Sequence, residues 1–307
     1  MSTIVQLALG VGGPGLPSLA DAGDIAAAAA EAGVAAIRLA DQSPAGRALD
    51  PTVVAAYLAG LHAGIGFLPV VPTTGNAPYN AARRLLSLDR ATGGRAGVVL
   101  RPGGGDEVSE ASVPDPGATD PARRWTEYAR VLTQLWESFP NKALLGDQQA
   151  GVVADDTLIR PIAHEGEFYR VAGPLDGPSS VQGRPVIVAD LGTLDVTAVA
   201  ASADVVVVDR TQAAGVDAVL SQALRLAGRD RSEVALLGRI PVNRGDAVAG
   251  GLPARLRAWA DEQLLDGFEL VPQGGPDHVI AILRALEPRP QAPTLRAAYG
   301  LREGALV

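Results

Sequence analysis

The chain has no cysteine and only three histidines among its 307 residues. Without cysteine the protein has no disulfide, no thiolate nucleophile and no sulfur-ligated metal centre. The histidines are widely spaced at His62, His164 and His278, so we do not expect a histidine-rich metal site. No Ser-His-Asp or paired-carboxylate motif has a distinctive local signature, and the sequence therefore predicts no metal and singles out no catalytic residue.

Positive charge and long apolar runs are also scarce. The chain has 26 Lys and Arg against 34 Asp and Glu, which gives a formal net charge of −8. Proteins that bind nucleic acid or anionic membranes neutralise phosphates with a basic excess, which this chain lacks. No apolar run reaches the roughly 18 residues needed to cross a bilayer, and the opening segment MSTIVQLALGVGG lacks the cationic stretch of a signal peptide. We expect a cytoplasmic protein that binds neither nucleic acids nor membranes.

Apolar residues are plentiful, at 47% of the chain, which is enough to bury a large core. Short β-rich runs alternate along the sequence with stretches of helical periodicity. The runs lie at residues 3–9, 35–40, 65–70, 95–100, 184–189, 203–208, 233–239 and 267–271. The helical stretches lie near residues 21–32, 51–61, 79–91, 121–138, 194–202, 212–227, 252–264 and 276–287.

This alternation predicts an α/β protein with parallel strands and crossover helices. The strands are apolar almost throughout, as expected when both faces are covered. Eight such units in a chain of this length favour a closed (β/α)8 TIM-like barrel, forming a single domain over residues 1–307. The rhythm breaks at about residues 140–183, between strands four and five. A long excursion that contains a hairpin and then returns to the barrel is typical of a functional loop.

In such a barrel the active site is built from the loops that follow the strands. The polar or flexible residues at these positions are Asp41, Gln42, Thr73, Thr74, Asn76, Arg101, Asp190, Gly192, Thr193, Asp209, Arg210, Arg239, Asn243 and Gln273. Most of them also have a purely structural interpretation. Asp41 can cap a loop, and the two threonines can form an ordinary turn before the next helix. Arg101 can pair with Asp41 or Asp106, or bind a phosphate or carboxylate.

Two glycine-rich segments and one histidine have structural interpretations. The stretch GVGGPG at residues 10–15 lacks the spacing of a dinucleotide-binding fingerprint, and no helix with Lys-Ser/Thr follows Gly103–Gly105 as a P-loop requires. His164 lies in HEGEFYR, where we expect a hairpin residue and not a catalytic base.

Several longer segments resemble one family in the same order along the chain. PYNAARRLLSLDRATGGRAG at residues 78–97 is similar to a characteristic stretch of the bacterial luciferase-like flavin monooxygenases, in the branch with the nitrilotriacetate and dibenzothiophene-sulfone enzymes. IRLAD at 37–41, RWTEYARVLTQLWESF at 124–139, HEGEFYRVAGPLDGPSSVQGRPVIV at 164–188 and the later DGFEL and TLRAAYGL resemble further segments of that branch. The resemblance covers most of the chain.

The resemblance implies a TIM-like barrel that is often a homodimer. It implies reduced FMN as cofactor, supplied by a separate flavin reductase, and a reaction in which the flavin and O₂ oxidise a small organic substrate. Carried over by position, the cofactor-binding residues are Asp41, Thr73, Thr74, Arg101, Gly192 and Thr193.

The sequence departs from the family at several flavin-facing positions. Where strand four of the family ends in W-N-V-V-T-S, this chain has Val98 to Gly103, which lack the family's amide and hydroxyl groups. After strand five the family's Q-A-G-x-S loop is replaced by ADLGT at 189–193. Thr193 still offers a hydroxyl to a phosphate there, whereas Asp190 is expected to repel one. Two alternatives therefore stay open: a non-catalytic paralogue that serves as a partner or binding subunit, and a barrel that uses a deazaflavin.

Overall fold

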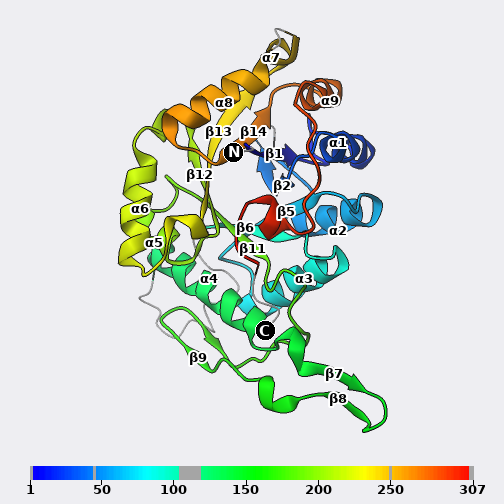
Figure 1. Ribbon diagram of the computed structural model, residues 1–307, viewed down its shortest axis with the longest axis vertical. Coiled ribbons are helices and arrows are strands. Elements are labelled where there is room, and N and C mark those ends of the chain that lie inside the picture. Colours follow the sequence, from blue (N-terminus) through cyan, green and yellow to red (C-terminus); the bar gives the residue numbers. More distant parts are fainter. Residues whose placement is uncertain (1–2, 44–45, 104–118, 249–250, 304–307) are drawn as a thin grey trace.

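The computed structural model describes residues 3–43, 46–103, 119–248 and 251–303. Eight parallel strands close into a barrel in the order β1-β14-β13-β12-β11-β6-β5-β2 (Figure 1). Their bounds are β1 (Ile4–Gly10), β2 (Ala36–Ala40), β5 (Gly66–Pro72), β6 (Gly97–Arg101), β11 (Val186–Asp190), β12 (Val205–Asp209), β13 (Ala235–Val242) and β14 (Gly267–Pro272). The predicted (β/α)8 barrel is confirmed, and all eight predicted strands are present.

A ring of helices surrounds the strands in Figure 1. Its members are α1 (Leu19–Glu31), α2 (Pro51–Leu61), α3 (Pro78–Ala91), α4 (Pro121–Glu137), α5 (Val196–Ser202), α6 (Val216–Leu226), α8 (Leu252–Gln263) and α9 (Pro276–Arg284). Local chemistry sets several of their starts. Asp50, Asp120 and Asp195 accept hydrogen bonds from backbone N–H groups in the first turns of α2, α4 and α5. These carboxylates satisfy donors that no helical carbonyl can reach.

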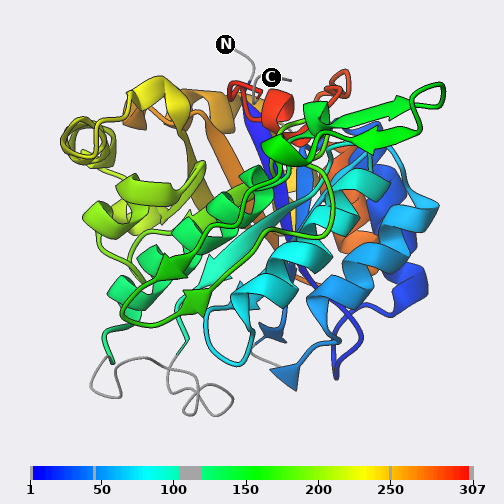
Figure 2. The same cartoon turned by 90° about the horizontal axis from the view of Figure 1, so that it is seen from below.

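The interruption predicted between strands four and five is also present. Between α4 and β11 the chain forms two antiparallel hairpins, β7 (Leu144–Asp147) with β8 (Val152–Ala154), and β9 (His164–Glu165) with β10 (Arg170–Val171). His164 is a hairpin residue, as expected. The short helix α10 (Leu295–Ala298) and the β7–β8 hairpin lie at one end of the molecule, and the β3–β4 hairpin lies at the other (Figure 2).

The remaining elements are short, and the periodicity of the sequence did not predict them. They are β3 (Gln42–Ser43), β4 (Gly46–Arg47), α7 (Arg244–Val248) and the 3-10 turns η1 (Asn141–Ala143), η2 (Asp156–Leu158), η3 (Arg210–Gln212) and η4 (Arg231–Glu233). None of the helices in the described ranges is long and apolar enough to cross a membrane.

The core has two layers. The larger layer lies between the strands and the surrounding helices. The second fills the barrel interior, where alternate strand residues such as Leu68, Val99 and Val188 pack together. Leu295 and Tyr299, from α10 and the residue after it, pack against this inner layer. The C-terminal segment therefore closes the end of the barrel at which the strands begin, and leaves the other end for a site.

Helix α4 is held to the barrel by its aromatic residues. The indole N–H of Trp125 donates to the Leu100 carbonyl on β6 at 2.9 Å, and that of Trp136 donates to the Ala82 carbonyl on α3 at 3.0 Å. Glu127 on the same helix accepts hydrogen bonds from the backbone N–H groups of Phe168 and Tyr169 at 3.0 and 2.8 Å. The β9–β10 hairpin is thereby attached to α4 through one carboxylate.

Candidate functional site

The six residues assigned to cofactor binding follow β2, β5, β6 and β11, four consecutive strands of the barrel. Two of them are in direct contact, since Arg101 Nη2 lies 2.6 Å from Asp41 Oδ2. Both side chains are partly exposed, at 35% and 27%. Of the two carboxylates weighed as partners of Arg101, the structure selects Asp41, and Asp106 lies outside the described residues.

The threonine pair joins the loops after β5 and β6. Thr73 is buried, and its hydroxyl oxygen accepts a hydrogen bond from the Gly103 N–H at 3.2 Å. Its carbonyl accepts another from the Tyr169 hydroxyl at 2.8 Å. A Cβ on Gly103 would lie 1.8 Å from Thr74 Oγ1, so this close approach of the two loops requires glycine. The turn interpretation of Thr73 and Thr74 therefore accounts for their contacts, whether or not a ligand also uses them.

The loop after β11 is exposed. Gly192 has a φ of +105°, which favours glycine, and the Thr193 hydroxyl donates to the Asp190 carbonyl at 3.0 Å. Other strand-end candidates already have partners. Arg84 donates to the Asn76 side chain at 3.1 Å, and Arg210 stacks over Trp259 at 5.4 Å.

An ion-pair network spans the barrel interior below these loops. Arg38 on β2 donates to both carboxylate oxygens of Asp190 on β11, at 2.7 and 2.6 Å. Arg239 on β13 also pairs with Asp190, and its Nε lies 2.6 Å from Glu269 Oε1 on β14. Arg239 further approaches Asp209 at 3.3 Å. Because Asp190 is shared by two guanidinium groups, its charge is compensated inside the barrel, and the expectation that it simply repels a phosphate does not hold.

The network continues down the barrel axis. Gln6 on β1 donates to Glu269, and the hydroxyl of Tyr299 donates to Gln6. Gln6 and Glu269 are completely buried, and Tyr299 is 2% exposed. A chain of polar contacts thus connects the closed end of the barrel to the charged side chains near its mouth.

The pKa values of the network favour its charged forms. Burial alone would raise the pKa of Asp190, but the hydrogen bonds and charges of Arg38 and Arg239 bring the pKa below its usual value. For Arg38, burial acts to lower the pKa, and the charges of Glu269 and Asp190 overcome this and raise it. The network is therefore ionised at neutral pH.

Sequence reasoning identified Asp190 and Arg239 as strand-end residues but missed Arg38, Glu269 and Gln6. A signal was present: each is a single polar residue in the middle of an apolar strand, in AIRLA, GFELVP and IVQLALG. Alternation with buried neighbours places such a residue inside the barrel. Buried polar groups need partners, so several of them in one barrel indicate a network.

Alternation along the strands also divides the mouth into two halves. On β6, β11, β12 and β13 the last inward positions carry charged side chains, namely Arg101, Asp190, Asp209 and Arg239. On β14, β1, β2 and β5 they carry small or apolar, partly exposed residues, namely Val271, Ala8, Gly10, Ala40 and Pro72. The mouth therefore combines an apolar surface with a cluster of charges.

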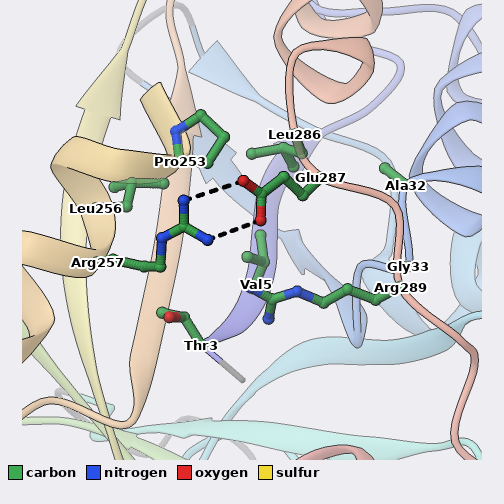
Figure 3. A pocket seen from close by; sticks show the side chains of 10 residues that line it. All are labelled: Thr3, Val5, Ala32, Gly33, Pro253, Leu256, Arg257, Leu286, Glu287 and Arg289. Carbon is green, nitrogen blue, oxygen red and sulfur yellow. Dashed lines mark hydrogen bonds and ion pairs between the residues drawn. The ribbon is translucent and has the colours of Figure 1, made fainter. Parts of the chain in front are cut away.

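A small pocket between α8 and α9, at the opposite end of β1, is not a competing ligand site. Figure 3 shows it crossed by the Arg257–Glu287 ion pair, with distances of 2.8 and 3.0 Å. Its volume of about 20 Å³ leaves room for about one water molecule. No group of three or more His, Asp or Glu side chains able to hold a metal ion occurs in the described part of the chain.

Comparison with known proteins identifies the barrel. The model of the luciferase-like monooxygenase family matches residues 2–279. One of the two named subunits of a pristinamycin IIA synthase, from Streptomyces pristinaespiralis, is 30% identical over 278 residues, which cover 90% of this chain and 84% of that protein. Nitrilotriacetate monooxygenase component A from Aminobacter aminovorans is 37% identical over 144 residues, which cover 46% of this chain but only 32% of that protein.

Solved structures share the fold at lower sequence identity. EDTA monooxygenase from Chelativorans sp. BNC1 superimposes with a TM-score of 0.77 at 19% identity, over 100% of both chains. A long-chain alkane monooxygenase reaches a TM-score of 0.79 at 16% identity, over 100% of this chain and 97% of the other. Family members that act on small organic substrates are flavin-dependent. The resemblance seen in the sequence is confirmed, and the chain belongs to the luciferase-like monooxygenase family.

Proposed function

We propose that this protein is a monooxygenase that binds reduced FMN at the barrel mouth and oxidises a small organic molecule with O₂. The observation that carries the proposal is the family match over residues 2–279 on a closed barrel. A separate reductase supplies the reduced flavin, which agrees with the designation of one relative as component A of its monooxygenase. Solved structures of the same fold are described with a modified FMN and with FMN, at TM-scores of 0.77 and 0.62.

The residues at the mouth fit an FMN molecule in two respects. Its small apolar half offers a surface for a planar ring system, and its charged half offers donors to a phosphate. The Nε of Arg101 is buried and has no hydrogen-bond partner within the part of the chain that the structure describes. A buried donor of this kind costs free energy unless a ligand satisfies it, so we assign Arg101 to the phosphate.

The other assigned residues have supporting roles. Asp41 orients the Arg101 guanidinium, and Thr193 offers a hydroxyl at the exposed end of β11. Thr73 and Thr74 fix the loop after β5, and Gly192 lets the loop after β11 turn. When bound, the flavin supplies the oxygen-activating chemistry, and the protein positions it and excludes water.

The experiment mixes the protein with reduced FMN and then with air, and follows flavin absorbance in a stopped-flow instrument. A monooxygenase that holds the flavin changes the rate of flavin reoxidation when the protein is in excess. A reoxidation rate equal to that of free FMN at every protein concentration would sink the proposal.

A second candidate is a non-catalytic partner subunit. Two observations favour it: the guanidinium groups of Arg38 and Arg239 are already paired with carboxylates of the barrel, and a relative aligned over 90% of this chain is named as one subunit of a synthase. This candidate predicts a folded protein that does not bind FMN by itself. Titration with FMN therefore separates the two.

We extend the proposal to a cytoplasmic homodimer, and to FMN in preference to a deazaflavin. Two deazaflavin-dependent enzymes share the fold with TM-scores of 0.67 and 0.64, below the 0.77 of the EDTA enzyme. Light scattering on the purified protein tests the dimer, and a parallel titration with a deazaflavin tests the choice of cofactor.

A further inference from the structure

A second cavity lies at the end of the barrel opposite the mouth. It has a volume of about 940 Å³ and is bounded by the second half of α4, the end of α5, the segments before β11 and β13, and the chain from α10 onward. Five arginines line it, namely Arg130, Arg184, Arg229, Arg296 and Arg302. None of the residues assigned to the flavin takes part in it.

Two of these arginines share one buried carboxylate. Asp204 is 1% exposed and accepts hydrogen bonds from Arg184 at 2.7 and 2.8 Å and from the Ile187 N–H at 2.9 Å. Arg296 Nη1 lies 3.2 Å from the same carboxylate. Two positive charges therefore face one negative charge where water is largely excluded, and such an imbalance is costly.

Arg229 adds a third positive charge. Its Nη1 donates to the carbonyls of Ala200 and Ala203, at 2.8 and 2.9 Å, which are neutral acceptors. The carboxylate of Glu233 approaches its Nε only to 3.4 Å. The charge of Arg229 is thus only partly compensated.

Arg296 has an unused donor that faces the cavity. The residue is 9% exposed, and its Nε donates to the Arg302 carbonyl at 2.8 Å. Its Nη1 is buried and makes no hydrogen bond within the described ranges, because the geometry toward Asp204 is that of an ion pair alone. Burial lowers the pKa of Arg296, and the charges of Arg184 and Arg229 lower it further despite Asp204.

The rim of the cavity is mixed in charge. Arg130 and Arg302 are exposed, and neither guanidinium has a partner among the described residues. Besides Asp204 the lining carboxylates are Glu137, Glu233 and Glu303. Glu233 approaches Arg229, and Glu303 accepts the Thr294 hydroxyl. The unspent donors in this cavity therefore belong to arginines.

We propose that this cavity is a binding site for a phosphate group, either free phosphate or the phosphate of a small metabolite. A tetrahedral oxyanion accepts hydrogen bonds in several directions, which suits guanidinium groups that come from α4, α10 and the segments before β11 and β13. The cavity is larger than one phosphate ion, so it also has room for an organic remainder. The site is separate from the flavin site and does not depend on the proposed enzyme activity.

Isothermal titration calorimetry on the whole protein without flavin tests the site. Inorganic phosphate and glycerol 3-phosphate are titrated separately, with sodium chloride at matched ionic strength as the blank. We expect saturable binding of one anion per chain, and tighter binding of glycerol 3-phosphate if the metabolite is the source. Arg296→Gln, which loses the buried donor, is expected to weaken binding by about tenfold or more.

Three further variants complete the experiment. Arg302→Gln changes only an exposed rim residue and is expected to weaken binding several-fold in a folded protein, so the test stands even if Arg296→Gln does not fold. Arg225→Gln, an exposed arginine of α6 outside the cavity, and Arg101→Ala at the mouth are expected to bind as the parent does. The proposal is overturned if neither anion binds saturably. It is also overturned if Arg101→Ala abolishes binding while Arg302→Gln leaves it unchanged.

Discussion

Arg38 and Asp190 pair across the barrel interior, with both terminal guanidinium nitrogens donating to both carboxylate oxygens at 2.7 and 2.6 Å. Their strands, β2 and β11, are not neighbours, because β5 and β6 lie between them. The contact therefore forms only when the barrel closes. It converts two charges that would otherwise oppose burial into part of the barrel's interior.

Removing the charge of Asp190 is expected to destabilise the fold. In Asp190→Asn, Arg38 and Arg239 face each other with Glu269 as their only buried counter-charge, and we expect the free energy of unfolding to fall by about 3 kcal/mol. Urea denaturation measures this change. The matched control is Asp209→Asn, because the Asp209 side chain is 54% exposed and touches Arg239 only at 3.3 Å. Its effect should stay within about 0.5 kcal/mol, and equal losses in the two variants would contradict the account.

Asp89 is expected to make stability depend on pH. It is completely buried, and burial raises its pKa to about 6 although Ser180 and Gln182 donate hydrogen bonds to it. The folded protein thus holds a proton that the unfolded chain releases near its ordinary pKa of 3.8. The stabilisation is fully present below that value and is lost as the pH rises through about 6.

The variant Asp89→Asn keeps an acceptor for the Ala96 N–H but cannot titrate. Between pH 4 and pH 7 the free energy of unfolding of the parent should fall relative to that of the variant by up to about 3 kcal/mol. Denaturation at a series of pH values gives this difference directly. If it is constant over the range, Asp89 does not titrate as described.

Glu127 is expected to control the β9–β10 hairpin and not the barrel. In Glu127→Ala the N–H groups of Phe168 and Tyr169 lose their acceptor, and His164 loses a partner at 3.0 Å. Hydrogen exchange of residues 164–171 should become about tenfold faster or more, and exchange in the barrel strands should change little. Glu137→Ala, an exposed residue on the same helix, is the control. Unchanged exchange in the hairpin would show that other contacts hold it.

Arg101 is expected to determine the affinity for FMN. Arg101→Ala removes a guanidinium that we assign to the phosphate, and the dissociation constant for reduced FMN should rise by about tenfold or more. Arg83→Ala removes an exposed arginine of α3 that pairs with Asp176, and should bind FMN as the parent does. Anaerobic calorimetry compares the three proteins. Equal affinities in all three would remove Arg101 from the flavin site.

The barrel could be predicted because its signals are local. Each strand is a short apolar run, and helix starts such as Asp50-Pro51 and Asp120-Pro121 combine a cap with proline in the first turn. The helix α10 escaped prediction because its four residues are too few to show a period.

The centre of the site escaped prediction for a different reason. Arg38 lies 152 residues from Asp190 and 231 from Glu269, and no local pattern pairs residues so far apart. The contact between Asp41 and Arg101 was one of several alternatives, since it depends on β2 and β6 lying on either side of β5. Position at a strand end predicts that a residue faces the mouth, but only barrel closure decides its partner.

Anaerobic titration of the protein with reduced FMN tests the central claim most directly. The account predicts saturable binding of one flavin per chain, which Arg101→Ala weakens and Arg83→Ala does not. A folded protein that shows no saturable binding up to about millimolar flavin, where the binding free energy would be only about −4 kcal/mol, would contradict it.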